Sequence, residues 1–194
     1  MRDLTVTLIQ TSLDWQDAAA NRARFGRLIA GIDEPTDLIV LPEMFTTGFT
    51  MDSADHAETM HGDTLAWMSR TARESGATVC GSLIIADDGR YTNRLVWMPP
   101  DAPPAVYDKR HLFRMAGEHE HFTPGRSRLI TRLGDWRVCP LVCYDLLFPV
   151  FSRGLDEFDL LLHVAHCPAS RRSASRPPLP SRSLKNLCYG PRVP

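Results

Sequence analysis

Apolar runs of strand length recur along most of the chain, separated by polar residues, glycine and proline. Pro42 ends one run because proline cannot donate to a strand ladder. Asp87, Asp88 and Gly89 form a hairpin turn between two other runs. Strands are therefore predicted at residues 4–10, 37–41, 78–85, 91–98, 106–107, 128–133, 136–143 and 158–164.

Stretches with helical spacing of apolar side chains lie between these runs. In the first of them, Phe25, Leu28 and Ile32 share one face. Helices are predicted at residues 15–32, at residues 145–154, and from a cap at Asp63 or Thr64 to Gly76. Interleaved strands and helices predict a mixed α/β fold, with sheets that carry helices on their outer faces.

The composition of the chain changes after Ala165. Residues 166–194 are rich in proline, serine and arginine, and prolines at 177, 178 and 180 would interrupt a long helix. This composition favours disorder over a packed helix or sheet, apart from a short helical pattern at 184–187. We therefore expect one domain over residues 1–165 and an atypical tail over residues 166–194.

Length and charge restrict the class of protein and of partner. A chain of 194 residues, 43% of them hydrophobic, has the size and composition of one globular domain with a substantial core. The formal net charge of −1 and the lack of an aromatic and basic cluster argue against a nucleic-acid partner. No apolar run is long enough to span a bilayer, so a membrane partner is not expected either. A small-molecule partner is favoured.

The cysteines indicate a reducing compartment. Their number, five, is odd and they contain no CxxC pair, so neither a disulfide framework nor a structural zinc site is predicted. The N-terminal residues lack the apolar core of a secretory signal. We therefore expect a cytoplasmic protein with reduced thiols.

Cys143 is a candidate nucleophile. It ends a predicted strand and precedes a predicted helix, where backbone N–H groups and the helix dipole can lower the pKa of a thiol. A buried structural cysteine is the alternative, as it is for Cys139 in the same strand.

A thiol that attacks an amide also needs a base and a group that stabilises the oxyanion. Glu43 follows a strand end, a position that often points into the crevice of an α/β sheet. Lys109 lies where charged residues meet aromatic ones, so a partly desolvated ammonium there could face a developing negative charge. A solvated loop acid and a surface lysine are the alternatives for these two residues.

The segment Glu118–His121 alternates glutamate and histidine, residue types that ligate zinc or iron. No second cluster at ligand spacing completes such a site, so a solvated loop is the alternative to a metal site. The same segment could instead bring a second carboxylate to Lys109.

Three motifs follow one another along the chain: Leu-Pro-Glu at 41–43, Tyr-Asp-Lys with His-Leu-Phe at 107–113, and Cys-Tyr-Asp-Leu at 143–146. In these motifs and in their order, the chain resembles the nitrilase superfamily of carbon-nitrogen hydrolases. Pro-Glu-Met-Phe at 42–45, with Gly48 and Phe49, is similar to the omega-amidase-like branch of that superfamily. The resemblance extends from about residue 4 to about residue 165.

The resemblance implies an α-β-β-α sandwich that pairs into a homodimer. It also implies a mechanism in which Glu43 is the general base, Lys109 stabilises the transition state and Cys143 forms a thioester. By the same resemblance, Glu118 supports Lys109 and the substrate, and the backbone N–H of Tyr144 completes the oxyanion hole. The implied substrates are omega-amides of dicarboxylic 2-oxo acids, 2-oxoglutaramate or 2-oxosuccinamate, and no metal or organic cofactor is implied.

This chain departs from the family pattern at two places. Leu147 stands where members commonly have arginine, and Val-Ala-His-Cys-Pro at 164–168 replaces Val-Ala-Asn-Trp-Pro. The chain also ends where members continue through further strands, so the sandwich is expected to be incomplete at its C-terminus. A truncated gene product, or a reading frame altered near Ala165, is the corresponding hypothesis.

Three functional interpretations therefore follow from the sequence. The first is an active thiol amidase. The second is a catalytically inert remnant that serves as a scaffold or partner-binding subunit. The third is a related hydrolysis of carbamoyl or nitrile groups by the same thiolate attack.

Overall fold

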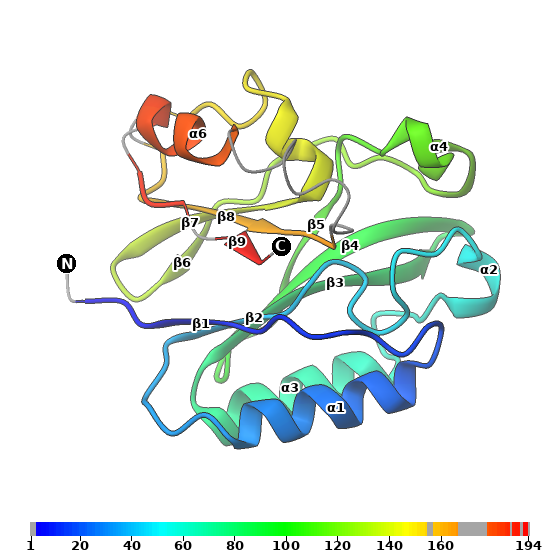
Figure 1. The fold of residues 1–194 in the computed structure, drawn as a ribbon, viewed down its shortest axis with the longest axis horizontal. Coiled ribbons are helices and arrows are strands. Elements are labelled where there is room, and N and C mark those ends of the chain that lie inside the picture. Colours follow the sequence, from blue (N-terminus) through cyan, green and yellow to red (C-terminus); the bar gives the residue numbers. More distant parts are fainter. Residues whose placement is uncertain (1–2, 155–156, 167–177, 187, 191, 194) are drawn as a thin grey trace.

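A computed structural model of the protein describes residues 3–154, 157–166, 178–186, 188–190 and 192–193, whose strands form two sheets (Figure 1). In the first sheet the strand order is β1-β2-β3-β4-β5. These strands are β1 (Val6–Leu8), β2 (Leu38–Val40), β3 (Thr78–Asp87), β4 (Arg90–Met98) and β5 (Ala105–Asp108). The second sheet consists of β6 (Thr131–Leu133), β7 (Trp136–Val142), β8 (Leu160–Val164) and β9 (Arg192–Val193), in that order.

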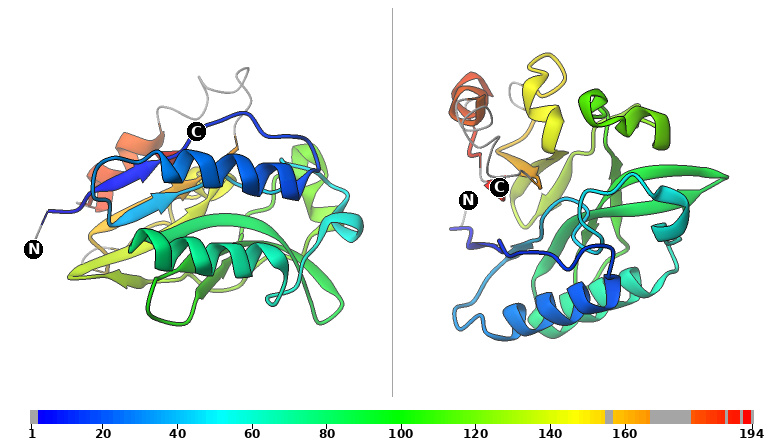
Figure 2. Two further views of the ribbon diagram at one scale, coloured as in Figure 1. Left: turned by 90° about the horizontal axis from the view of Figure 1, so that it is seen from below. Right: turned by 45° about the vertical axis from the view of Figure 1, so that its right-hand side comes forward.

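Helices cover the outer sides of both sheets. The described helices are α1 (Ala18–Ala30), α2 (Ser53–His56), α3 (Asp63–Ser75), α4 (Glu118–His121) and α6 (Pro178–Asn186), with 3-10 helices η1 (Arg114–Ala116) and η2 (Cys143–Leu147). Figures 1 and 2 show α1 and α3 side by side against the first sheet, and α6 beyond the second sheet. The layers therefore follow the order α-β-β-α, and the predicted sandwich is confirmed.

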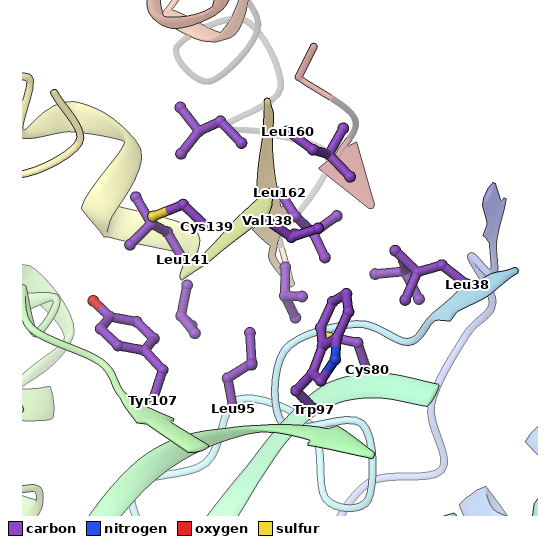
Figure 3. Close-up of a cluster of buried hydrophobic side chains, with 14 of the residues drawn as sticks. Leu38, Cys80, Leu95, Trp97, Tyr107, Val138, Cys139, Leu141, Leu160 and Leu162 are labelled. Atoms are coloured by element: carbon purple, nitrogen blue, oxygen red, sulfur yellow. The ribbon is translucent and has the colours of Figure 1, made fainter. Parts of the chain in front are cut away.

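Side chains along the strands of the first sheet point alternately into two hydrophobic cores. Leu95 and Trp97 of β4 face the second sheet, where they pack with residues of β7 and β8 (Figure 3). Val96 and Met98 face the opposite way, into the core beneath α1 and α3. Because both faces of these strands are buried, their sequences are apolar without a clear alternation.

Most predicted strands are confirmed within a few residues, and the predicted hairpin is confirmed as well. Asp87 pairs with Arg90, which leaves Asp88 and Gly89 as the two turn residues. Both have positive φ angles, 49° and 71°, as a two-residue turn between twisted strands requires.

The predicted helix over 145–154 is wrong. The chain forms η2 at Cys143–Leu147 and continues in turns. Pro149 disfavours helical backbone at the preceding residue, and Phe148 accordingly has φ −109° and ψ 85°. The segment after Cys143 is therefore a tight turn rather than a long helix.

The cap of α3 also differs from the prediction. Gly62 is the N-cap, and Asp63 is already the first helical residue. Glu58 supplies the missing acceptor, because the Thr64 N–H donates to its Oε2 at 2.8 Å. The predicted end of α3 is confirmed, since Gly76 is left-handed with φ 67°.

Helix α6 lies within the tail, where a packed helix is not predicted apart from the short helical pattern at 184–187, which overlaps the end of α6. Pro178 and Pro180 stand in its first turn, where a missing N–H removes no intrahelical bond. The division at residue 165 stays a prediction, and residues 167–177 lie outside the described part.

None of the helices in the described part of the chain has the length and apolar character needed to cross a bilayer.

Candidate active site

Four side chains from separate segments of the chain meet in one cluster. Glu43 follows β2, Lys109 directly follows β5, Glu118 is the first residue of α4, and Cys143 opens η2 after β7. Glu43, Lys109 and Glu118 are each 0% exposed, which excludes a solvated loop acid and a surface lysine. The structure brings these predicted residues together, and their catalytic roles stay predictions.

Lys109 lies between the two glutamates. Its Nζ is 2.8 Å from Glu43 Oε1, and 3.0 and 2.9 Å from Glu118 Oε1 and Oε2. Burial by itself would lower the pKa of Lys109, but the charges of Glu43 and Glu118 outweigh burial and raise that pKa. The ammonium therefore stays protonated inside the protein.

Glu118 belongs to this cluster, and its full burial excludes a solvated loop. The pKa of the Glu118 carboxyl is raised. Burial is the largest cause; the charge of Lys109 lowers the pKa, and the charge of Glu43 raises it. The Phe113 N–H also donates to Glu118 Oε2, which fixes the side chain at the start of α4. No group of three or more His, Cys, Asp or Glu side chains within the described segments is placed to hold a metal ion.

Cys143 has a strained backbone and a thiol that strongly favours its protonated form. Its φ angle is 43°, in the left-handed region that residues other than glycine rarely adopt. Burial raises the pKa of the thiol well above its usual value, the charge of Glu43 raises it further, and Lys109 lowers it. The expectation of a lowered pKa is therefore wrong for this arrangement, because burial and a neighbouring carboxylate outweigh the ammonium and the helix terminus.

Because the pKa of the Cys143 thiol is raised, a nearby carboxylate is needed to accept the thiol proton. A hydrogen bond with the Glu43 side chain contributes to the raised pKa. Glu43 Oε1 already accepts from Lys109 and Asn93, whereas Oε2 accepts from the backbone N–H of His166 at 3.2 Å. Oε2 therefore keeps capacity to receive the thiol proton, as a general base must.

Asn93 is a buried residue of the site that the sequence reasoning missed. Its Nδ2 lies 2.9 Å from Glu43 Oε1 and 3.1 Å from Glu118 Oε1. A signal was present, because Asn93 shares the strand face of Leu95 and Trp97 and is therefore a polar residue at an inward position.

Asp145 is a second missed residue, and it joins the nucleophile turn to the segment around Lys109. Its carboxylate accepts from Tyr107 Oη at 2.7 Å, from the His111 N–H at 2.9 Å and from the Val142 N–H at 3.1 Å. The ring of His111 in turn stacks on Phe148, with ring centres 3.7 Å apart. Segments on both sides of Cys143 are thereby fixed to segments on both sides of Lys109.

Aromatic rings border the cluster. The Phe49 ring centre is 5.2 Å from Lys109 Nζ, and the rings of Phe113 and Tyr144 meet edge to face at 5.0 Å. Tyr144 follows Cys143 in η2, where the first N–H groups of a helix lack intrahelical partners. The proposed role of its N–H in an oxyanion hole stays a prediction.

The two departures from the family pattern affect the site differently. His166 contacts Glu43 through its backbone N–H, and this contact does not depend on the type of side chain. Leu147 is 46% exposed and stands at the end of η2. Cys167 and Pro168 lie outside the described residues.

Known proteins are similar to this chain over most of its length. The chain matches the carbon-nitrogen hydrolase family over residues 5–193. It is 42% identical to omega-amidase YafV of Escherichia coli K12 over 189 residues, which is 97% of this chain and 73% of that protein. It is 24% identical to a 2-oxoglutaramate amidase of Bacillus subtilis, over 95% of this chain and 73% of that protein.

Solved structures show the same fold. The crystal structure of XC1258 from Xanthomonas campestris, a CN-hydrolase superfamily protein with an arsenic adduct in its active site, matches with a TM-score of 0.96. That protein is 42% identical to this chain, and the match covers 99% of this chain and 76% of the other.

Proposed function

The chain belongs to the carbon-nitrogen hydrolase family and is an amidase, and from this premise we propose its substrate and its mechanism. The proposed substrates are omega-amides of small dicarboxylic 2-oxo acids, 2-oxoglutaramate or 2-oxosuccinamate. Support comes from the similarity to YafV, an omega-amidase, and to a 2-oxoglutaramate amidase. The products are the dicarboxylic 2-oxo acid and ammonia.

The observation that carries the mechanism is a fully buried lysine between two buried glutamates, with a cysteine beside them. In the first half-reaction Glu43 accepts the thiol proton while Cys143 Sγ attacks the amide carbon. The charge of Lys109 and the N–H of Tyr144 stabilise the tetrahedral oxyanion. Glu43 then returns the proton to the amide nitrogen, the carbon–nitrogen bond breaks, and ammonia leaves a thioester on Cys143.

The second half-reaction returns the enzyme to its starting state. Glu43 takes a proton from a water molecule, whose oxygen attacks the thioester carbon. The carbon–sulfur bond then breaks, and the thiolate recovers the proton from Glu43. Glu118 holds Lys109 throughout, and the raised pKa of the free Cys143 thiol is the reason that a base is needed in the first step.

The test is ammonia release from 2-oxoglutaramate and 2-oxosuccinamate by the purified protein, with Cys143→Ala as the control. We expect the variant to lose activity by about a thousandfold or more. A simple nitrile and a carbamoyl amino acid belong in the same panel, because turnover of either in place of the omega-amides would contradict the proposed substrate. Folded protein that turns over none of these compounds would contradict the function and favour a scaffold or partner-binding subunit.

We also propose that the protein acts in the cytoplasm as a homodimer. A thiol nucleophile needs a compartment that keeps it reduced, which the cytoplasm provides. The homodimer follows from the family resemblance. Light scattering coupled to gel filtration measures the assembly directly, and a monomer at micromolar concentration would contradict the homodimer.

A further inference from the structure

Asn93 places a neutral donor between the two carboxylates of the site. It is a fully buried residue of β4, and its Nδ2 contacts Glu43 Oε1 at 2.9 Å and Glu118 Oε1 at 3.1 Å. Lys109 Nζ contacts the same two oxygens at 2.8 and 3.0 Å. One charged group and one neutral amide thus bridge the same pair of carboxylate oxygens.

The main chain of Asn93 also positions Lys109. Its carbonyl oxygen accepts a hydrogen bond from the Lys109 N–H at 2.9 Å. This bond continues the ladder between β4 and β5, in which Arg94 pairs with Asp108. The residue therefore fixes the backbone of Lys109 and the side chains of both glutamates.

The two acceptors determine the orientation of the Asn93 amide. The reverse orientation would point Oδ1 at two carboxylate oxygens, which cannot donate while ionised. In the observed orientation, Oδ1 is buried and has no hydrogen-bond partner among the described residues. An unpaired buried oxygen destabilises the fold. The contacts of Nδ2 with the two carboxylates, and not the pairing of Oδ1, therefore explain how the amide is placed.

We propose that Asn93 is a positioning residue, which keeps Glu43 separated from Glu118 and aimed at Cys143. The inference rests on the proposed function, because it assigns Asn93 a role through the proposed base. The other groups that face Glu43 are Lys109, Glu118, Cys143 and the backbone N–H of His166. Without the amide, Lys109 alone bridges the two carboxylates, and Glu43 is held less firmly in place.

The first experiment measures the pH dependence of kcat/KM for omega-amide hydrolysis. Asn93→Ala should lower kcat by about a hundredfold with less than about a threefold change in KM, because the base is misplaced rather than the substrate site. The acid limb should move to higher pH by about one unit, because a lost N–H donor disfavours the ionised base. Asn93→Asp keeps the shape but replaces donors by acceptors, and should be at least as inactive at neutral pH.

Thr92→Ala is the matched control. Thr92 neighbours Asn93 on β4, is 6% exposed, and its hydroxyl makes no hydrogen bond with any described residue. It should keep the acid limb unchanged and kcat within about twofold. A purely structural role for Asn93 would lower the amount of folded enzyme, which thermal melting reports, without moving the acid limb.

The second experiment does not depend on the substrate. The rate of Cys143 alkylation by iodoacetamide, followed by peptide mass, should rise in Asn93→Ala at neutral pH, because a Glu43 carboxylate that Asn93 no longer holds beside the thiol opposes the thiolate less. In a Glu43→Gln background the same substitution should have no further effect, because the charge through which Asn93 acts is absent.

The two experiments separate failure of the inference from failure of the proposed function. If the wild type hydrolyses none of the amides, the proposed function fails. The alkylation rates, measured with and without Asn93→Ala in the wild-type and Glu43→Gln backgrounds, still test the role of Asn93. The inference is overturned if Asn93→Ala leaves both the acid limb and the alkylation rate unchanged. It is also overturned if Asn93→Ala accelerates alkylation equally in both backgrounds, because that result indicates easier access rather than an effect through Glu43.

Discussion

At the scale of single residues, the resting site favours a protonated thiol beside a carboxylate. The charge of Glu43 is, after burial, the next largest cause of the raised pKa of Cys143. Glu43→Gln should therefore lower the pKa of the thiol and leave Lys109 as its charged neighbour. We expect alkylation of Cys143 at pH 7 to become about tenfold faster while ammonia release is lost. Slower alkylation would show that Glu43 assists the thiol more than its charge restrains it.

Lys109 is the charge that makes the two buried glutamates compatible. Lys109→Met removes the cation beside Glu118. The pKa of Glu118, which burial already raises, should then rise further. A carboxyl whose pKa is higher in the folded state than in the unfolded state contributes stability at pH values below its unfolded pKa. This stability is lost as the pH rises through the folded-state pKa. We therefore expect Lys109→Met to lose about 3–5 kcal/mol of unfolding free energy at pH 8, and less at pH 5. Urea unfolding at both pH values measures the difference, and an equal loss at both would contradict the explanation.

Not every residue of the site could be predicted from the sequence. Glu43, Lys109, Glu118 and Cys143 lie in or next to motifs that resemble a family, so they were found. Asn93 contacts partners 50 and 25 positions away, and no local pattern specifies those partners. The pKa of Cys143 was predicted in the wrong direction because burial and the charge of Glu43 arise only from the tertiary structure.

At the scale of secondary-structure elements, Asp145 connects η2 to the end of β5. Its buried carboxylate receives hydrogen bonds from the side chain of Tyr107 and from the backbones of His111 and Val142. Asp145→Ala leaves these donors without an acceptor, and we expect a loss of about 2–4 kcal/mol of unfolding free energy. The strained φ of 43° at Cys143 would relax as well, so kcat should fall by at least about tenfold in the folded protein.

Asp145→Asn separates the two effects. It retains one acceptor oxygen in the same shape, and should therefore recover part of the stability measured by urea unfolding. The kcat measured on the folded fraction should recover less, because the amide cannot accept at both carboxylate positions. Full activity in Asp145→Asn would contradict a need for both acceptors.

The elements themselves were predicted unevenly. Apolar runs located the strands because strands buried on both faces need such runs. The helix over 145–154 was wrong because Pro149 and the contacts of Asp145 stabilise a short turn. The first part of helix α6 was missed because composition alone does not distinguish prolines in a first turn from prolines that break a helix, whereas the predicted pattern at 184–187 overlaps the end of α6.

At the scale of the whole molecule, the segment around α6 is packed against the segment that follows the nucleophile. The Asn186 side chain is 4% exposed, accepts from the Gly154 N–H at 3.0 Å and donates to the Ser152 carbonyl at 3.1 Å. Arg182 Nε donates to the carbonyl of Leu146 in η2 at 3.1 Å. These contacts join residues on both sides of the predicted division at 165.

Asn186→Ala tests whether the two parts form one cooperative unit. The substitution leaves a buried N–H and a buried carbonyl without partners, so we expect a loss of about 1–3 kcal/mol of unfolding free energy. If the segment folds with the rest, urea unfolding followed by tryptophan fluorescence stays a single transition and its midpoint shifts to lower urea. Lys185→Ala is the control, because that neighbouring residue is exposed and should change the free energy by less than about 0.5 kcal/mol. An unchanged midpoint in Asn186→Ala would instead support a separate tail after residue 165, as the composition of the chain predicts.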